Sequence, residues 1–435
     1  MCNKAYLPFG RGKLEVDLSA VAGRCTVLER KRGDSLREIT VDDLHKSFAQ
    51  PVASPPLREV IRPQDSVCIV TSDGTRPFLP MRFMLHAVIG HLGLTPEKTT
   101  ILTGSGSHWP HTEEELQDLF CRRIYPRFRV ICHDSRSDDN APVGRLADGS
   151  RVTMNRHYLE ADRKVILGHI EPHIFAGFTG GPKGIAPAIC GIETIHRLHS
   201  YDVISDPSSC VGEIEDNACA RVIREAAAMA PPDFLVNVVL DKTLKPVAVV
   251  SGDYLAAHRE GVEISRAISE VDVPRRYPIV VTTNGGHPLD QNLYQTIKGL
   301  VAGHAIVEKN GMIIIVSECA QGVPSGSAFE KMLTSSATNE TLLSELSNKK
   351  SDVDDRWQVQ RLLEILSECR VILVSSLDRE TTRQCRLEYA ETVEAALEQA
   401  LASCGGRADI GVLPDGPSVI PNLIGSAPPG CGRSG

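Results

Sequence analysis

The residues best suited to chemistry are gathered in one run of the chain, residues 168–200. Within 33 residues this run holds four histidines and six glycines around a single lysine, Lys183. The histidines are His169, His173, His196 and His199, and the glycines include Gly180 and Gly181. Glycine clusters occur where the backbone takes a positive φ or comes close to a ligand. The pattern therefore predicts that the amine of Lys183 is presented to a ligand.

Two common motifs do not fit this run. A phosphate-binding loop ends in Gly-Lys-Ser or Gly-Lys-Thr, whereas Lys183 stands in Pro-Lys-Gly. A zinc-binding His-Glu-x-x-His helix fails as well. His169 and His173 have its spacing, but Pro172 breaks any helix there and the glutamate stands at the wrong offset.

A second pair of histidines closes the run. His196 and His199 stand three residues apart on a predicted short helix that begins near Thr194. That spacing brings both imidazoles to one side of a helix. One of them could be a metal ligand, although a single histidine is more often an ordinary surface or core residue.

The elements that must position these residues alternate between strands and helices. Residues 65–71 are typical of a buried strand, residues 79–92 of a helix and residues 99–103 of a second strand. Residues 164–167 predict a further strand that leads directly into the run around Lys183. This order predicts a βαβ unit, in which ligands gather at the carboxyl ends of the strands.

Polar loops follow the first two of these strands. The first loop carries Asp73, Thr75 and Arg76, which can hold a ribose and pair with a phosphate or a carboxylate. The second is a glycine-rich bridge that carries His108. A capping box beginning at Thr112 predicts that a helix starts directly after this bridge.

A domain boundary is predicted at residues 271–278, where two prolines and two adjacent arginines interrupt the pattern. A second α/β unit follows, with a strand at 279–283 and a helix at 289–303. The polar stripe of that helix contains Gln291, Gln295 and Lys298. Trp357 lies off the apolar stripe of a later helix at 353–369, so it either caps the fold or faces a ligand-binding cleft.

Composition limits the class of protein. The chain has 435 residues, 42% of them hydrophobic and 23% charged, which is ordinary for a globular protein. Its net charge of -8 and its few aromatic residues (5%) argue against nucleic acid as a partner. The 13 cysteines include no Cys-x-x-Cys pair, and no secretory or membrane-spanning segment is recognisable, so we expect reduced thiols, no membrane and a cytoplasmic location.

These observations predict an α/β protein of two domains with mainly parallel sheets. The expected N-terminal domain comprises residues 1–271 and contains the run around Lys183, and the C-terminal domain comprises residues 272–424. Residues 425–435 form a low-complexity tail that we expect to be disordered. The active site is expected in a cleft between the domains.

Taken together, the motifs resemble those of the lactate racemase family, enzymes that use a nickel-pincer nucleotide. The resemblance rests on the run around Lys183, on Asp-Gly-Thr-Arg-Pro at 73–77 and on Gly-x-His-x-Pro-x-Thr-Glu-Glu-Glu at 106–115. Asn-x-Tyr-Gln-x-x-Lys-Gly at 292–299 belongs to it as well. The matching motifs occur in the family's order.

The resemblance implies a role for each predicted site residue. Lys183 would hold the cofactor covalently as a thioamide, and His199 would be the protein ligand to nickel. His108 and His173 would be the two proton-transfer bases. The further cofactor-binding residues would be Asp73, Thr75, Arg76, Gly180, Gly181 and Trp357, and the substrate-binding residues would be Arg76, Tyr294, Gln295 and Lys298.

The implied reaction is the racemisation or epimerisation of a 2-hydroxy acid. C2 of the substrate gives hydride to the cofactor while a histidine removes the hydroxyl proton, and return of hydride to the other face inverts the centre. The expected partners are this small substrate and the enzymes that build the cofactor. Trp109, His111, Glu171 and Phe175 flank the predicted bases and would shape specificity, without identifying the 2-hydroxy acid.

Two other functions remain open from the sequence. The first is a non-catalytic relative that retains the nucleotide-binding site. The second is a hydrolase that holds a zinc ion on His169, His173 and His196. The non-catalytic relative would be marked by loss of Lys183, His199 or both bases, all of which are present. Metal content separates the hydrolase from the racemase, because the hydrolase predicts zinc and no covalent adduct.

Overall fold

The computed structural model describes residues 4–18, 24–30, 36–73, 80–108, 111–347 and 353–424. Thr75, Arg76 and Trp109 of the predicted site, and the predicted disordered tail, lie outside these residues. The chain divides into two compact units. One comprises residues 32–199 and 211–268, and the other comprises residues 1–31, 200–210 and 269–435.

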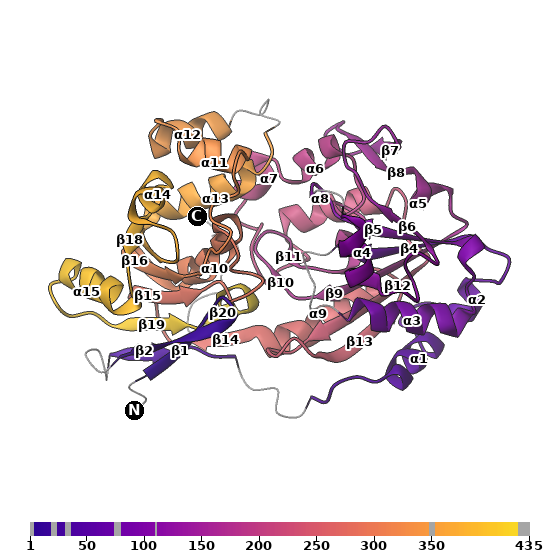
Figure 1. The fold of residues 1–435 in the computed structure, drawn as a ribbon, viewed down its shortest axis with the longest axis horizontal. Coiled ribbons are helices and arrows are strands. Elements are labelled where there is room, and N and C mark those ends of the chain that lie inside the picture. The colour runs from indigo at the N-terminus through magenta and orange to yellow at the C-terminus, as the bar shows by residue number, and fades with distance from the viewer. Residues whose placement is uncertain are drawn as a thin grey trace. The chain divides into compact units, whose positions relative to one another are not determined.

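The first unit, here called the lysine unit, is built on a six-stranded sheet with the order β13-β12-β9-β4-β5-β6 (Figure 1). Its strands are β4 (Val67–Ser72), β5 (Thr99–Gly104), β6 (Arg129–Cys132), β9 (Arg163–Ile170), β12 (Phe234–Leu240) and β13 (Pro246–Gly252). All neighbours are parallel except β12 and β13, which form an antiparallel hairpin. The predicted βαβ unit is confirmed by β4, α3 and β5.

Helices and small hairpins complete the lysine unit. The helices are α1 (Val41–Ala49), α2 (Leu57–Val60), α3 (Met81–Leu92), α4 (Glu113–Phe120), α5 (Arg156–Glu160), α6 (Ile192–Leu198), α8 (Ala218–Ala227) and α9 (Ala256–Ser269). The hairpins are β7 (Asn140–Arg145) with β8 (Arg151–Asn155), and β10 (Pro172–His173) with β11 (Gly177–Phe178). The apolar faces of α1, α3 and α4 pack with the sheet in one core that includes Phe48, Leu85 and Phe120.

Strand register explains why the polar loops start together. Ser72, the last residue of β4, is paired with Gly104, the last residue of β5. Asp73 and the bridge that carries His108 therefore leave the sheet at the same edge. The capping box is present, because the Thr112 hydroxyl accepts from the Glu115 amide while the Glu115 carboxylate accepts from the Thr112 amide.

The second unit, here called the helix unit, has a parallel six-stranded sheet with the order β18-β17-β16-β15-β19-β3. Its strands are β3 (Cys25–Val27), β15 (Tyr277–Thr283), β16 (Val307–Val316), β17 (Arg370–Val374), β18 (Glu388–Ala390) and β19 (Ile410–Leu413). The hairpin of β1 (Lys4–Phe9) and β2 (Gly12–Asp17) and the parallel pair β14 (Glu270–Val273) and β20 (Ile420–Leu423) accompany it. β3, from the N-terminal segment, pairs with β19 of this sheet.

The helices of this unit lie on both faces of its sheet. They are α7 (Tyr201–Ser205), α10 (Leu293–Ile306), α11 (Ala328–Leu333), α12 (Asn339–Leu346), α13 (Arg356–Glu368), α14 (Arg379–Gln384) and α15 (Val393–Ser403). One core joins α10 and α13 to the sheet, and a second joins α15 and the β1–β2 hairpin to it. None of the helices in the described ranges is both long and apolar enough to cross a membrane.

Two local features differ from the pattern-based expectation. The chain passes from one unit to the other at residues 268–269, next to the expected linker, but residues 271–273 of that linker belong to β14, because pairing with β20 supplies hydrogen-bond partners that a local pattern cannot reveal. The helix expected at 289–303 begins only at Leu293. The side chain of Asn292 caps it by accepting from the Gln295 amide, so the residues before Asn292 lie outside the helix.

Candidate functional site

Asp73 and His108 form a hydrogen-bonded pair at the shared edge of β4 and β5. Asp73 Oδ2 lies 2.7 Å from His108 Nδ1. The carboxylate is buried, whereas 49% of the His108 side chain is exposed. Because a carboxylate accepts, Nδ1 must donate, and the lone pair of the neutral imidazole is then on Nε2. His108 is therefore oriented to accept a proton at Nε2.

The bridge before His108 is fixed by backbone and side-chain hydrogen bonds. The amide of His108 donates to Ser105 O over 3.0 Å, and the Ser105 hydroxyl donates to His133 O over 2.6 Å. Gly106 N donates to Ala188 O over 2.9 Å, which ties the bridge to the segment that follows Lys183. The two motifs that the sequence singled out separately are thus in direct contact.

His173 has the opposite tautomer. Its Nδ1 accepts from the backbone amides of Phe175 at 3.2 Å and Ala176 at 3.1 Å. Since both partners can only donate, Nδ1 carries the lone pair and the neutral ring carries its proton on Nε2. Of the two predicted bases, His108 is thus set to accept at Nε2 and His173 to donate there.

Lys183 lies on a tight turn, residues 179–184, here called the lysine turn. Gly180 and Gly181 have φ values of +79° and +52°, and the Lys183 amide donates to Gly180 O over 3.1 Å. The positive φ predicted from the glycines is therefore present. Lys183 lines one pocket together with Ala220 and Ile223 of α8.

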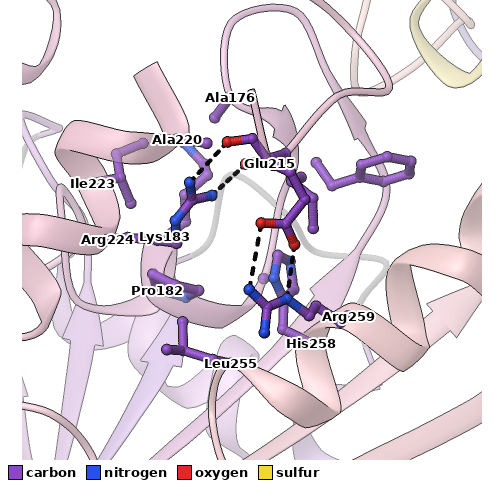
Figure 2. A pocket seen from close by; sticks show the side chains of 13 residues that line it. Ala176, Pro182, Lys183, Glu215, Ala220, Ile223, Arg224, Leu255, His258 and Arg259 are labelled. Carbon is purple, nitrogen blue, oxygen red and sulfur yellow. Dashed lines mark hydrogen bonds and ion pairs between the residues drawn. The ribbon is translucent and has the colours of Figure 1, made fainter. Parts of the chain in front are cut away.

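A pocket borders the lysine turn (Figure 2). Its volume, including its open mouth, is about 390 Å³. The wall combines apolar side chains with the charged residues Lys183, Glu215, Arg224 and Arg259. Figure 2 shows Glu215 paired with Arg259, at 2.7 Å, while Arg224 donates to backbone carbonyls of the loop before α8. The pocket gives space beside Lys183 and carries an excess of positive charge.

His199 is oriented as a histidine metal ligand usually is. It is the C-cap of α6, and His196 lies in the last turn of that helix, three residues earlier. Its Nδ1 lies 2.9 Å from Ile195 O, and because a carbonyl accepts, Nδ1 donates and Nε2 carries the lone pair. Metal-ligating histidines commonly donate the other ring N–H to a carbonyl in this way.

The zinc alternative requires His169, His173 and His196 to bind one metal ion together. His169 lies on β9, is buried, and its Nε2 is 3.0 Å from Glu171 Oε1. Within the described ranges, no group of three His, Cys, Asp or Glu side chains is arranged to hold a metal ion. Among the residues that the structure describes, these three histidines therefore do not form a site with several protein ligands.

The predicted substrate-binding residues lie in the helix unit. Tyr294, Gln295 and Lys298 are in the first turns of α10, and Trp357 is in the first turn of α13. Trp357 Nε1 donates to the Tyr294 hydroxyl over 3.1 Å, and burial raises the pKa of that phenol, which keeps it neutral. Gln295 Oε1 is buried with no hydrogen-bond partner among the described residues. A buried amide oxygen of this kind is satisfied when a ligand donates to it.

Two residues next to the lysine turn were missed from the sequence. Asn237 Oδ1 accepts from the Gly181 amide over 2.9 Å, and His258 Nε2 lies 2.9 Å from Thr179 O. For Asn237 a signal existed, because it is the one polar residue in the buried strand FLVNVVL. For His258 we find no such signal, because it lies in an ordinary amphipathic helix.

This chain is similar to known proteins over most of its length. Residues 9–212 match the lactate racemase N-terminal domain, and residues 274–421 match the lactate racemase C-terminal domain. A lactate racemase of Thermoanaerobacterium thermosaccharolyticum is 32% identical over 423 residues, covering 95% of this chain and 98% of the relative. A lactate racemase of Lactiplantibacillus plantarum is 33% identical over 385 residues, covering 87% and 90%.

Solved structures give the same result. The lactate racemase apoprotein from Thermoanaerobacterium thermosaccharolyticum superposes with a TM-score of 0.89 at 31% identity, covering 96% of this chain and 100% of that one. A protein from Thermotoga maritima shares the fold with a TM-score of 0.68 at 18% identity, covering 89% and 99%.

Proposed function

This chain belongs to the lactate racemase family, and from that premise we propose that it interconverts the enantiomers of a 2-hydroxy acid, with lactate as the first substrate to test. The observation that carries the proposal is the match over nearly the whole chain. The chain also has the four residues to which the resemblance gives a role, Lys183, His108, His173 and His199. A binding protein that had lost catalysis would have no need to retain all four.

The residues of the lysine unit fit the nickel-pincer nucleotide that the resemblance implies. Lys183 borders a pocket with positively charged walls, which suits a covalently held nucleotide. His199 carries its lone pair on Nε2, which suits a single bond to nickel. When bound, the cofactor would supply an acceptor for the hydrogen on C2, which would leave as hydride. The C2–H group is too weakly acidic for a side-chain base alone to remove that hydrogen as a proton.

The remaining chemistry falls to the chain's own side chains. His108 Nε2 accepts the hydroxyl proton as hydride leaves C2, so the substrate becomes a flat 2-oxo acid. Asp73 keeps the His108 ring in the accepting tautomer and stabilises the imidazolium that forms. In its present tautomer His173 can only donate its Nε2–H to the substrate oxygen, and serving as the base of the mirror-image pose requires the tautomer with the proton on Nδ1. Gln295 and Lys298 would bind the carboxylate while the 2-oxo group turns.

The experiment is an intact-mass measurement on the chain produced together with the enzymes that build the cofactor. Lys183→Ala and Lys183→Arg test the attachment, and Lys245→Ala, at an exposed lysine of the β12–β13 hairpin, is the matched control. We expect a nucleotide-sized adduct, and racemisation of L- and D-lactate, for the native chain and for Lys245→Ala only. Full racemisation by Lys183→Ala would refute the proposal.

A further inference from the structure

The lysine turn is shaped by residues that pack behind its two glycines. A Cβ on Gly180 would lie 2.6 Å from Asn237 Oδ1, and one on Gly181 would lie 2.4 Å from Cγ of His258. Real Cβ atoms do not approach other atoms so closely. The position that a side chain would occupy on Gly180 is filled by Asn237, and on Gly181 by His258. Glycine is therefore needed at both positions for these close contacts as well as for the positive φ.

Asn237 is the first of these two residues. It lies in the middle of β12, is fully buried, and interrupts a strand that is otherwise apolar. Its Oδ1 accepts from Gly181 N at 2.9 Å, and its Nδ2 donates to Val236 O at 2.9 Å. A buried amide without hydrogen-bond partners destabilises the folded state, so Asn237 is tolerated here because the lysine turn supplies a partner for its Oδ1.

His258, on α9, is the second. Its Nε2 is 2.9 Å from Thr179 O, so the ring donates to the residue that opens the lysine turn. Burial, together with the positive charges of Arg224 and Arg259, lowers the pKa of His258 to about 4. The ring is therefore neutral near pH 7, which leaves it one N–H, and that N–H is used on Thr179.

These contacts act on the segment that carries Lys183. Asn237 holds the Gly181 amide, His258 holds the Thr179 carbonyl, and the Lys183 amide is bonded to Gly180 O between them. Both residues reach the lysine turn from elements far along the chain, 56 and 79 residues away. The path of the backbone at Lys183 is thus set by contacts from β12 and α9 as well as by the glycines of the lysine turn itself.

We propose that Asn237 and His258 are positioning residues for Lys183, which clamp the lysine turn so that the amine is held where the cofactor is attached. This inference rests on the proposed function for its purpose, but the clamp itself is a property of the apoprotein. Bond formation at the amine requires it to be placed to within about 1 Å, because a displacement of that size can cost roughly a hundredfold in rate.

The test compares variants that differ only in the clamp. His258→Leu removes the donor to Thr179 O, whereas His258→Gln retains an N–H at a similar position. Gly181→Ala pushes against the His258 ring from the other side. Gly149→Ala is its matched control, because Gly149 also has a positive φ, of +86°, but its Cβ would meet nothing within 4 Å.

Two quantities are measured for each folded variant. The first is the fraction of chain carrying the adduct after production with the cofactor-building enzymes. The second is hydrogen exchange of residues 177–190 in the apoprotein. We expect His258→Leu and Gly181→Ala to lower the adduct fraction at least about tenfold and to speed exchange in that peptide. His258→Gln and Gly149→Ala should stay close to the native chain.

The outcomes separate the clamp from the proposed function. If His258→Leu has the same adduct fraction and the same hydrogen-exchange rates as the native chain, the clamp is overturned. If that variant does not fold, the same result in Gly181→Ala overturns it. An absent adduct on the native chain, while a known racemase made alongside carries one, refutes the proposed function instead. Exchange in the apoprotein then still decides about the clamp, and equal exchange in His258→Leu and His258→Gln counts against it.

Discussion

Replacing Asp73 tests how His108 is made ready to accept a proton. Asp73→Asn retains a side-chain oxygen that can accept from Nδ1, but it removes the negative charge 2.7 Å from the ring. A hydrogen bond to a charged partner contributes roughly 1.5–3 kcal/mol. Because half of the His108 side chain is exposed and water competes there, we take the lower end, which corresponds to a loss of about tenfold in kcat. Asp73→Leu removes the acceptor as well and should cost about a hundredfold.

The assay measures racemisation from L- and from D-lactate by chiral chromatography, with the adduct mass measured on the same samples. The enantiomers have equal free energy, so kcat/KM must fall by the same factor in both directions, which checks the data internally. Asp162→Asn is the control. It removes a carboxylate that accepts from Ser66, at the opposite end of β4.

The adduct mass separates two roles for Asp73. The sequence predicts it as a cofactor-binding residue, whereas its hydrogen bond makes it a positioning residue for His108. A normal adduct with reduced racemisation supports the second role, and a lost adduct supports the first. Full racemisation by Asp73→Leu would refute the reasoning about the tautomer of His108.

Two further predictions concern stability. Gly177→Ala should lower the free energy of unfolding by at least about 2 kcal/mol, because Gly177 has a φ of +76° and a Cβ there would lie 1.8 Å from Glu213 O. Urea denaturation measures this change. An effect no larger than that of Gly149→Ala would contradict the prediction. The free energy of unfolding should also fall by roughly 2 kcal/mol between pH 7 and pH 5 on account of His258 alone. Its folded pKa of about 4 lies below the unfolded value of 6.5, so acid protonates the unfolded chain first and stability is lost as the pH falls through 6.5 towards 4. The loss should be smaller by that amount in His258→Gln, and equal losses in the two proteins would show that His258 does not titrate as described.

Much of the lysine unit could be predicted because its signals are local. The apolar run before Asp73, the apolar run before the His108 bridge and the capping box after it each lie within a few residues. Parallel neighbours end at the same edge of a sheet, so the pairing of Ser72 with Gly104 follows once both strands are recognised. The positive φ values at Gly180 and Gly181 follow from residue type in the same way.

The boundaries of elements in the helix unit were harder to predict from the sequence. β14 exists because it pairs with β20, which is about 150 residues later, and β3 joins a sheet whose other strands begin near residue 277. Short strands of this kind carry too little pattern to be recognised alone. The predicted cleft between the domains stays a prediction.

The sequence by itself determined which residue types are available for chemistry and on which strand ends and turns they lie, because periodicity, glycine and caps act over a few residues. Only the tertiary structure decided what each side chain does there. The opposite tautomers of His108 and His173 come from the partners that Nδ1 meets, a carboxylate in one case and two amides in the other. The clamp on the lysine turn likewise depends on β12 and α9 packing against it, and such contacts between distant segments form only when the whole unit is folded.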